Sequence, residues 1–216
     1  MSFVKWIMIL SNLPILLAAL YAIAIYATLG RTLRVFTWYI FITLLIQAPY
    51  LVLWLYGINN LALLHIYVLA GFLSLCAFYH SILKGFISPA IILVTAVAFS
   101  CFTIINSLFI QPMDTINSYA LTAESVLVVI LSLFSFIVFL DDGAKESRKD
   151  IMSSLRWINS GLFIYYASGL LLFYFSSLMV KIFPTSINRY AWLLNCFFLD
   201  VMYICFITGL WKRPKA

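Results

Sequence analysis

Four ionisable side chains lie inside long apolar stretches of the sequence, where lipid or packed protein would surround them. They are His65, His80, Glu124 and Asp200. Ionisable groups are costly in such surroundings, so they often mark a ligand site, an ion path or a proton relay. Glu124 and Asp200 would supply acid–base or cation-binding chemistry, and a histidine would supply hydrogen bonding or proton transfer.

The depths of two of these groups predict that they lie near each other. Glu124 comes six residues after Ser118, where a helix is expected to begin, which places it about 9 Å inside that helix. Thr122 and Ser125 flank it and are expected to hydrogen-bond its carboxyl group. His65 lies about one turn inside the same end of another predicted helix.

We therefore predict a ligand-binding pocket in one half of a helical bundle, formed by His65, Glu124, Asn106 and Asp200. The alternative is that these side chains, with Asn12 and Gln47, hydrogen-bond between helices and only hold the bundle together. His80 lies near the other end of its helix and is expected to reach the lipid headgroups or to cap the helix.

The composition indicates that the helices which carry these residues cross a membrane. Hydrophobic residues make up 65% of the 216 residues and charged residues 9%, against about 25% charged in soluble domains. Seven stretches reach the roughly 20 apolar residues that a membrane helix needs: 4–28, 35–56, 62–83, 87–110, 118–140, 156–180 and 190–211. Strands are excluded because membrane barrels alternate apolar and polar residues over short segments.

Lysine and arginine are distributed unevenly between the two sides that seven helices would create. Ten lie on one side, in the first, third and fifth loops, at the start of the sixth helix and in the tail, and three lie on the other side. Basic residues favour the cytoplasm, so we predict an outside N-terminus and a cytoplasmic C-terminus. The expected fold is an all-α polytopic bundle with one domain over residues 1–216, in a bacterial inner membrane.

One feature of the first stretch allows another interpretation. Ala22-Ile23-Ala24 resembles a signal-peptidase site. The apolar run is long for a signal peptide, and Arg31 and Arg34 follow it, so we expect a retained helix.

Several chemistries lack the residues that they need. Only two histidines are present, and they lie about 22 Å apart on one predicted helix, which disfavours haem and a three-histidine zinc site. The cysteines Cys76, Cys101, Cys196 and Cys205 have no CxxC spacing. We therefore expect no metal or other cofactor, and no nucleic-acid partner, because the basic residues lie in short loops. An enzyme is not expected, although one that uses only Glu124 and Asp200 stays open.

Several short phrases carry a family resemblance over most of the chain. They are Leu64-His65-Ile66-Tyr67, Phe78-Tyr79, Leu121-Thr122-Ala123-Glu124-Ser125, Trp157-Ile158-Asn159-Ser160-Gly161 and Gly209-Leu210-Trp211-Lys212. With them the chain resembles small bacterial seven-helix membrane proteins of uncharacterised function, and similar modules form the sensing half of histidine kinases. In that group an acidic residue often stands where this chain has Gly71. This departure weakens a site built around the 62–83 helix.

These observations lead to three functional hypotheses. In the first, the chain is a receptor or sensor-like module that binds a small or lipid-like ligand in the outer half of the bundle. A cytoplasmic partner would read the resulting helix shift at Asp141–Asp150 or at the basic tail. In the second, it is a small proton- or cation-coupled transporter with three plus one plus three helices, in which Glu124 or Asp200 carries the ion. In the third, it is a structural protein without a ligand.

Overall fold

The computed structural model describes residues 3–141, 149–182 and 185–214. Within these residues, seven helical segments are long and apolar enough to cross a membrane. They are Trp6–Thr28, Arg31–Leu55, Leu61–Leu83, Pro89–Ile110, Ser118–Leu140, Asp150–Ser176 and Tyr190–Trp211. The prediction of an all-α protein with seven membrane-length helices is confirmed, and the chain is an integral membrane protein.

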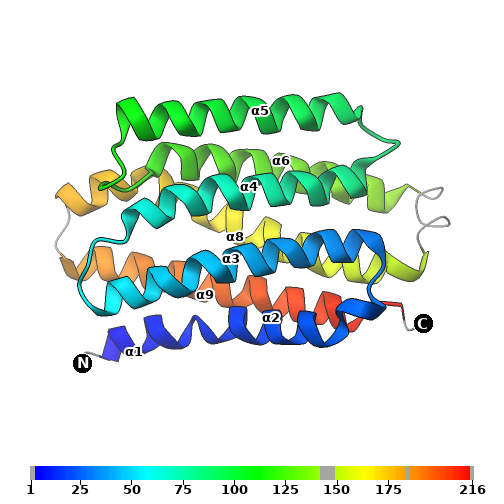
Figure 1. Ribbon diagram of the computed structural model, residues 1–216, viewed down its shortest axis with the longest axis horizontal. Helices are drawn as coiled ribbons and strands as arrows, with labels where there is room; N and C mark the ends of the chain where they lie inside the picture. The colour runs from blue at the N-terminus through cyan, green and yellow to red at the C-terminus, as the bar shows by residue number, and fades with distance from the viewer. Residues whose placement is uncertain (1–2, 142–148, 183–184, 215–216) are drawn as a thin grey trace.

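The helices lie side by side along the long axis of the molecule, with α5 on one flank and α2 on the other (Figure 1). The elements are α1 (Phe3–Leu10), α2 (Leu13–Ile25), η1 (Tyr26–Thr28), α3 (Arg31–Leu55), α4 (Leu61–Leu83), α5 (Pro89–Ile105), η2 (Asn106–Ile110), α6 (Ser118–Leu140), α8 (Lys149–Ile182) and α9 (Thr185–Trp211). The last helix packs against the first span, through α1 and α2, and against α8.

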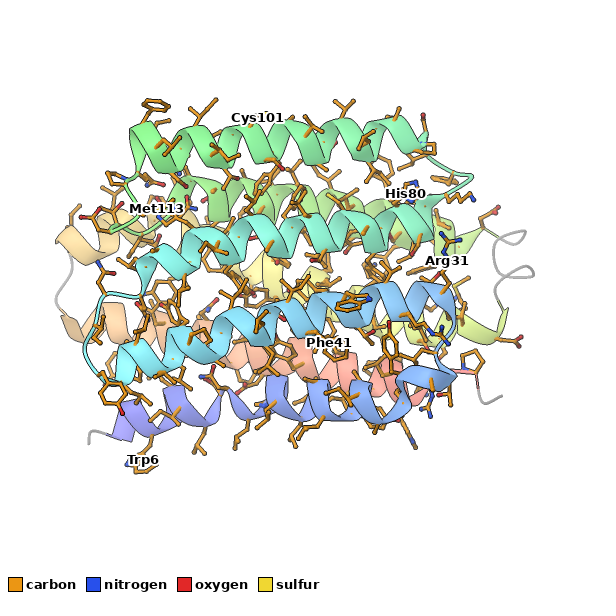
Figure 2. All side chains as sticks on the ribbon, viewed as in Figure 1. Trp6, Arg31, Phe41, His80, Cys101 and Met113 are labelled. Atoms are coloured by element: carbon orange, nitrogen blue, oxygen red, sulfur yellow. The ribbon has the colours of Figure 1, made fainter. Side chains whose placement is uncertain are left out.

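The two chain termini lie at opposite ends of the bundle (Figure 1). The connections 56–60 and 111–117 lie at the end that holds the N-terminus, which we call the N-terminal end. Trp6 and Met113 mark this end in Figure 2, and Arg31 and His80 lie toward the other end. His80 is exposed there.

Most residues of the spans are not buried inside the protein, and many of these residues are apolar. In an 18-residue stretch of each span, between 17% and 44% of the residues are buried. On α5, the exposed side chains include Leu93, Val94, Val97 and Phe102. Apolar surface on this scale requires an apolar solvent, and helices satisfy their own backbone hydrogen bonds within lipid. The arrangement indicates that the bundle is embedded in a bilayer.

The first predicted helix is interrupted, and the reason is Pro14. Proline lacks the backbone N–H that would continue the helix, and α1 ends at Leu10 before α2 begins at Leu13. The Ser11 hydroxyl and the Asn12 amide both donate to the carbonyl oxygen of Met8, over 2.9 and 2.8 Å. The interruption thereby turns polar side chains toward the bundle.

The sixth helix was predicted to begin at residue 156, after the longest polar run, and this boundary is wrong. Helix α8 already includes Lys149, and it continues to Ile182, beyond the predicted end at residue 180. Helix α9 begins at Thr185 instead of residue 190. Polar residues there extend the helices beyond the apolar stretch, which hydropathy alone does not detect. Residues 142–148 and Pro184 lie outside the described residues.

Three arginines stabilise helix ends opposite the N-terminal end. Arg34 donates to the carbonyl oxygen of Ala27 over 3.0 Å, and Arg156 donates to that of Phe139 over 3.1 Å. These carbonyls belong to the last residues of η1 and α6, where helix carbonyls lack partners and a positive charge is favourable. Arg213 bonds to the side chains of α2 and η1, which joins the last helix to the first span.

Helices α8 and α9 approach closely because two glycines lie at their contact. A Cβ atom on Gly161 would lie 2.8 Å from the Cβ atom of Cys205. A Cβ atom on Gly209 would lie 2.9 Å from the carbonyl oxygen of Ser154. Small residues let membrane helices pack backbone against backbone, so these two positions fix the separation of α8 and α9.

We expect Gly161→Ala and Gly209→Ala each to lower the free energy of unfolding by about 1–3 kcal/mol, because the added methyl group overpacks the contact. Gly71→Ala is the matched control, since a Cβ atom there would meet its nearest atom at an ordinary 3.6 Å. The measurement is the unfolding midpoint of the three variants in the same detergent. A Gly71 variant that loses as much stability as the other two would contradict this account.

Candidate functional site

His65 is held by two hydrogen bonds at the N-terminal end of the bundle. Its Nε2 atom lies 3.1 Å from the carbonyl oxygen of Thr115, and its Nδ1 atom lies 2.7 Å from the hydroxyl of Ser107. A carbonyl oxygen only accepts, so Nε2 carries a hydrogen, and in the neutral ring Nδ1 accepts from Ser107. His65 therefore ties α4 to η2 and to the 111–117 connection.

Asn106 lies beside this histidine network and begins the π-helical turn η2. Its amide nitrogen donates to the side-chain oxygens of Asn117 and Gln111, over 2.7 and 3.2 Å. The Gln111 side chain in turn donates to Ser118 and accepts from the backbone N–H of Tyr119. This network caps the start of α6, because it satisfies an N–H group that the first helical turn leaves unpaired.

Glu124 is buried in the middle of the bundle, with a side chain that is 1% exposed. The hydroxyl of Tyr166 on α8 donates to its Oε1 atom over 3.0 Å. Its Oε2 atom is buried and has no hydrogen-bond partner among the described residues. A Cβ atom on Gly71 of α4 would lie 3.6 Å from Oε1, so α4, α6 and α8 meet at this carboxyl group.

The hydroxyls predicted to support Glu124 point elsewhere. Thr122 donates to the carbonyl oxygen of Ser118, and Ser125 donates to that of Leu121. A hydroxyl in a helix readily bonds to the carbonyl one turn earlier, and that local bond prevails here. His65 and Glu124, which were predicted to lie near each other, bond to different partners. His65 bonds to Ser107 and Thr115, and Glu124 accepts from Tyr166.

Asp200 lies in α9 and is partly exposed, and its Oδ1 atom is buried without a partner in the described part of the chain. The structure thus brings His65 and Asn106 close together, because His65 bonds to Ser107, the residue after Asn106. Glu124 lies in a separate buried site with Tyr166, and Asp200 lies apart from both.

A cavity of about 470 Å³ lies at the N-terminal end, among residues of α1, α2, α3, α4, α6, α8 and α9. Asn59 and Asn60 line it at the end of the bundle. Trp192 and Tyr203, both on α9, also line it, and eleven residues of helix cover about 16 Å. The cavity therefore reaches from the end of the bundle toward its middle, and its size suits a small organic molecule.

Aromatic side chains form much of the cavity wall. Three come from one side of the bundle, Tyr50 and Trp54 on α3 and Tyr67 on α4. Four come from the other side, Tyr165 and Phe173 on α8 and Trp192 and Tyr203 on α9. These seven are almost a third of the 23 lining residues, whereas 18% of the chain is aromatic.

The four predicted site residues are not among the residues that line the cavity. Leu64, Leu121 and Leu199 line the cavity, and they precede His65, Glu124 and Asp200 by one, three and one residues. Asn106 bonds to Asn117, which follows the lining residue Ile116. The predicted site residues are therefore close in sequence to lining residues, but they do not line the cavity themselves.

A chain of contacts connects the cavity wall to Glu124. Tyr165 and Phe173 line the cavity, and their ring centroids lie 6.1 Å apart. The Tyr165 ring meets the Tyr166 ring edge to face, with 5.1 Å between centroids. Because Tyr166 donates to Glu124, a displacement of Tyr165 by a bound molecule would reach the buried carboxyl group.

A second buried polar cluster was not identified from the sequence. The Tyr79 hydroxyl lies 2.7 Å from the Ser132 hydroxyl and donates to Asn159 over 3.2 Å. Asn159 donates to the backbone carbonyl of Ser132 over 3.0 Å. These bonds join α4, α6 and α8, and all three side chains are fully buried. We assign the cluster to helix association, since its groups satisfy one another.

Comparisons of the chain with protein-family models, with curated proteins and with solved structures found no match. Among the described residues, no group of three or more histidine, cysteine, aspartate or glutamate side chains is placed to hold a metal ion. The cavity and the polar groups around it are therefore the features of the molecule that bear on its function.

We expect Tyr166→Phe to lower the free energy of unfolding by about 1–3 kcal/mol, because it removes the donor to a buried carboxyl oxygen. Tyr174→Phe is the control on the same helix, where the side chain is 53% exposed. In a Glu124→Leu background the Tyr166→Phe change should cost much less, and this double-mutant cycle isolates the pair. Equal effects of the Tyr166 and Tyr174 changes would show that the hydrogen bond contributes little.

Proposed function

We propose that the chain is a seven-helix receptor or sensor-like module that binds a small or lipid-like ligand in the cavity at its N-terminal end. The observation that carries this proposal is the cavity itself, which combines a wall of aromatic rings with side-chain amides from α3, α9 and two connections. Concave sites with a mostly apolar lining and a few polar groups are typical of small-molecule binding. We place the cavity at the outer face of a bacterial inner membrane, as the distribution of basic residues predicts.

Helix α8 supports a signalling role because it connects the cavity to the opposite end of the bundle. Tyr165 lies in the cavity wall, and Asp150 lies fifteen residues away near the start of the same helix. The two residues lie about 22 Å apart along one continuous helix. Such a helix can shift as a rigid body. A ligand that displaces Tyr165 would therefore also move the segment that leads into α8.

A partner would read this movement at the end of the bundle opposite the cavity. The candidate contact surfaces are the Asp141–Asp150 segment, of which 142–148 lie outside the described residues, and the basic tail that begins at Lys212. The resemblance to the sensing modules of histidine kinases implies the same division, with a ligand site in the membrane and an output outside it. His65, Asn106, Glu124 and Asp200 would then respond to the ligand through the residues that line the cavity.

A proton- or cation-coupled transporter is the second candidate, and the unpartnered Oε2 atom of Glu124 favours it. A buried carboxyl group with a free oxygen can take up a proton or a cation during a transport cycle. Proton-coupled flux in reconstituted vesicles that disappears on Glu124→Gln would support the transporter. Saturable binding without flux would support the receptor.

Enlarging a small residue in the cavity wall tests the ligand site. We expect Cys196→Phe to block it, because Cys196 lines the cavity and the added ring would occupy that space. Cys101→Phe is the matched control, since Cys101 is exposed on α5, which lies on the flank of the bundle (Figure 2). The measurement is mass spectrometry of small molecules extracted from both purified variants and from the unchanged protein.

The expected result is a species near one molecule per chain in the unchanged protein and in Cys101→Phe, reduced at least tenfold in Cys196→Phe. Equal unfolding midpoints would show that both variants fold. Identical extracts from all three proteins would contradict the proposed binding site.

A further inference from the structure

Two arginines from distant parts of the chain lie against the end of the first span, opposite the cavity. Arg34, near the start of α3, donates to the carbonyl oxygen of Ala27 over 3.0 Å. Arg213, which follows α9, donates through its Nε atom to the hydroxyl of Thr28 over 3.2 Å. Ala27 and Thr28 are consecutive residues of η1, so both guanidinium groups lie against the same short segment.

Aromatic rings help to position these two side chains. The Cζ atom of Arg34 lies 5.7 Å from the ring centroid of Tyr26, and that of Arg213 lies 6.0 Å from the ring centroid of Tyr21. Arg213 also donates through Nη1 to the Tyr21 hydroxyl over 3.1 Å. A cation over an aromatic ring is attracted to it. The two guanidinium groups are therefore held in place, although Arg34 is exposed and Arg213 is partly exposed.

Several N–H donors of the two guanidinium groups have no partner in the described part of the chain. A guanidinium group carries five such donors. The recorded hydrogen bond of Arg34 engages only Nη2. Those of Arg213 engage Nε and Nη1, which leaves its Nη2 atom available. Free donors on a planar, accessible guanidinium group suit the oxygens of a phosphate group.

No acidic residue lies in the segments around this pair. The sequence has no aspartate or glutamate before Asp114 or after Asp200. Asp150 lies near the start of α8, which packs against α9, and the described residues form no ion pair with it. The end of a helix supplies only about half a negative charge, which is less than the charge of two guanidinium groups. The pair therefore retains a net positive charge.

Two more basic side chains add to this charge. Arg31 begins α3 and lies toward this end of the bundle in Figure 2, and Lys212 directly precedes Arg213. Both are exposed, and neither side chain has a recorded hydrogen bond or ion pair within the described residues. We call Arg31, Arg34, Lys212 and Arg213 the basic cluster.

The surroundings of the basic cluster favour a lipid headgroup over a soluble anion. Trp38, one turn after Arg34, is 56% exposed, and Trp211, directly before Lys212, is 64% exposed. Exposed tryptophans at the ends of membrane helices typically lie at the interface between lipid and water. Trp38 also meets Phe41 edge to face, with 5.9 Å between ring centroids. An apolar surface for acyl chains therefore continues along α3 from the arginine.

We propose that the basic cluster binds the headgroup phosphate of an anionic phospholipid. The phosphate oxygens accept from the free N–H groups of Arg34 and Arg213, and the acyl chains lie along α3 beside Trp38 and Phe41. A zwitterionic headgroup fits less well, because it would place its ammonium group among the basic side chains. The site is at the opposite end of the bundle from the cavity, so this inference does not depend on the proposed function.

Lipid titrations followed by native mass spectrometry of the full chain in detergent test the inference. The probes are dioleoylphosphatidylglycerol, which is anionic, and dioleoylphosphatidylcholine, which has the same acyl chains and a zwitterionic headgroup. We expect one molecule of the anionic lipid per chain to bind about tenfold more tightly than the zwitterionic lipid. Equal affinities would overturn the inference. Displacement of the bound lipid by inorganic phosphate would assign the site to a soluble anion and overturn the choice of a lipid.

Arg34→Gln and Arg156→Gln form a matched pair of variants. Both arginines are exposed and donate to a helix-end carbonyl at the same end of the bundle, Arg34 to Ala27 and Arg156 to Phe139. We expect the affinity for the anionic lipid to fall about fivefold in Arg34→Gln and less than twofold in Arg156→Gln. Equal losses would show a general attraction between the charged end and the lipid, which would overturn a defined site.

A second variant keeps the test valid if Arg34→Gln unfolds. Arg31→Gln combined with Lys212→Gln removes two side chains that hold no recorded bond, so its unfolding midpoint without added lipid should match that of the unchanged chain. We expect its affinity for the anionic lipid to fall about tenfold or more, with little change for the zwitterionic lipid. An unchanged affinity for the anionic lipid would contradict the basic cluster as the binding site.

Discussion

Lipid offers no hydrogen bonds, and this constraint governs the structure more than any single contact does. Apolar side chains cover the outside of the spans, so each polar group inside the bundle must find a partner within the protein. Tyr79, Ser132 and Asn159 satisfy one another, and His65 uses both ring nitrogens. Against this background, a buried polar atom without a partner is informative.

Such atoms among the described residues include Oδ1 of Asn195, Oε2 of Glu124 and Oδ1 of Asp200. Asn195 lines the cavity, and Glu124 and Asp200 lie on helices that line it. Tyr165 and Tyr166 join the wall to Glu124, and both belong to α8. Because α8 also reaches the other end of the bundle, one helix lines the cavity, contacts the buried carboxyl group of Glu124 and leads to the expected output surface.

Helix α8 packs closely against α9, so two helices that line the cavity are in direct contact. Gly161 and Gly209 hold the two backbones near each other, and both helices contribute lining residues to the cavity. A molecule in the cavity would therefore contact two helices that pack closely against each other. Helix α5 contributes no described lining residue and lies at the flank of the bundle, which leaves it outside this path.

The sequence predicted the seven membrane-length helices but did not indicate the cavity. Long apolar stretches predict membrane helices because hydrophobicity is summed over about 20 residues, and no single residue decides the outcome. The start of α8 was missed because Lys149–Leu155 extends a helix with polar residues that hydropathy assigns to a loop.

The cavity depends on how helices distant in the sequence pack together. Tyr67 and Tyr165 in the wall look the same in sequence as the exposed Tyr174. The four ionisable or amide residues that the sequence singled out, His65, Asn106, Glu124 and Asp200, do not line the cavity. Their cost in lipid draws attention to them, whereas nothing in the sequence marks the side chains that line the cavity.

The central claim is that the chain crosses the membrane seven times and holds its cavity at the outer face. Labelling of Met113→Cys and Ser88→Cys in intact cells with a membrane-impermeant maleimide tests it most directly, since these exposed positions lie in connections at opposite ends of the bundle. The unchanged chain measures the background from its native cysteines. The account predicts labelling of the Met113 variant in intact cells and of the Ser88 variant only after lysis. Labelling of the Ser88 variant alone in intact cells would place the cavity on the cytoplasmic side, and labelling of both would contradict the seven-span topology.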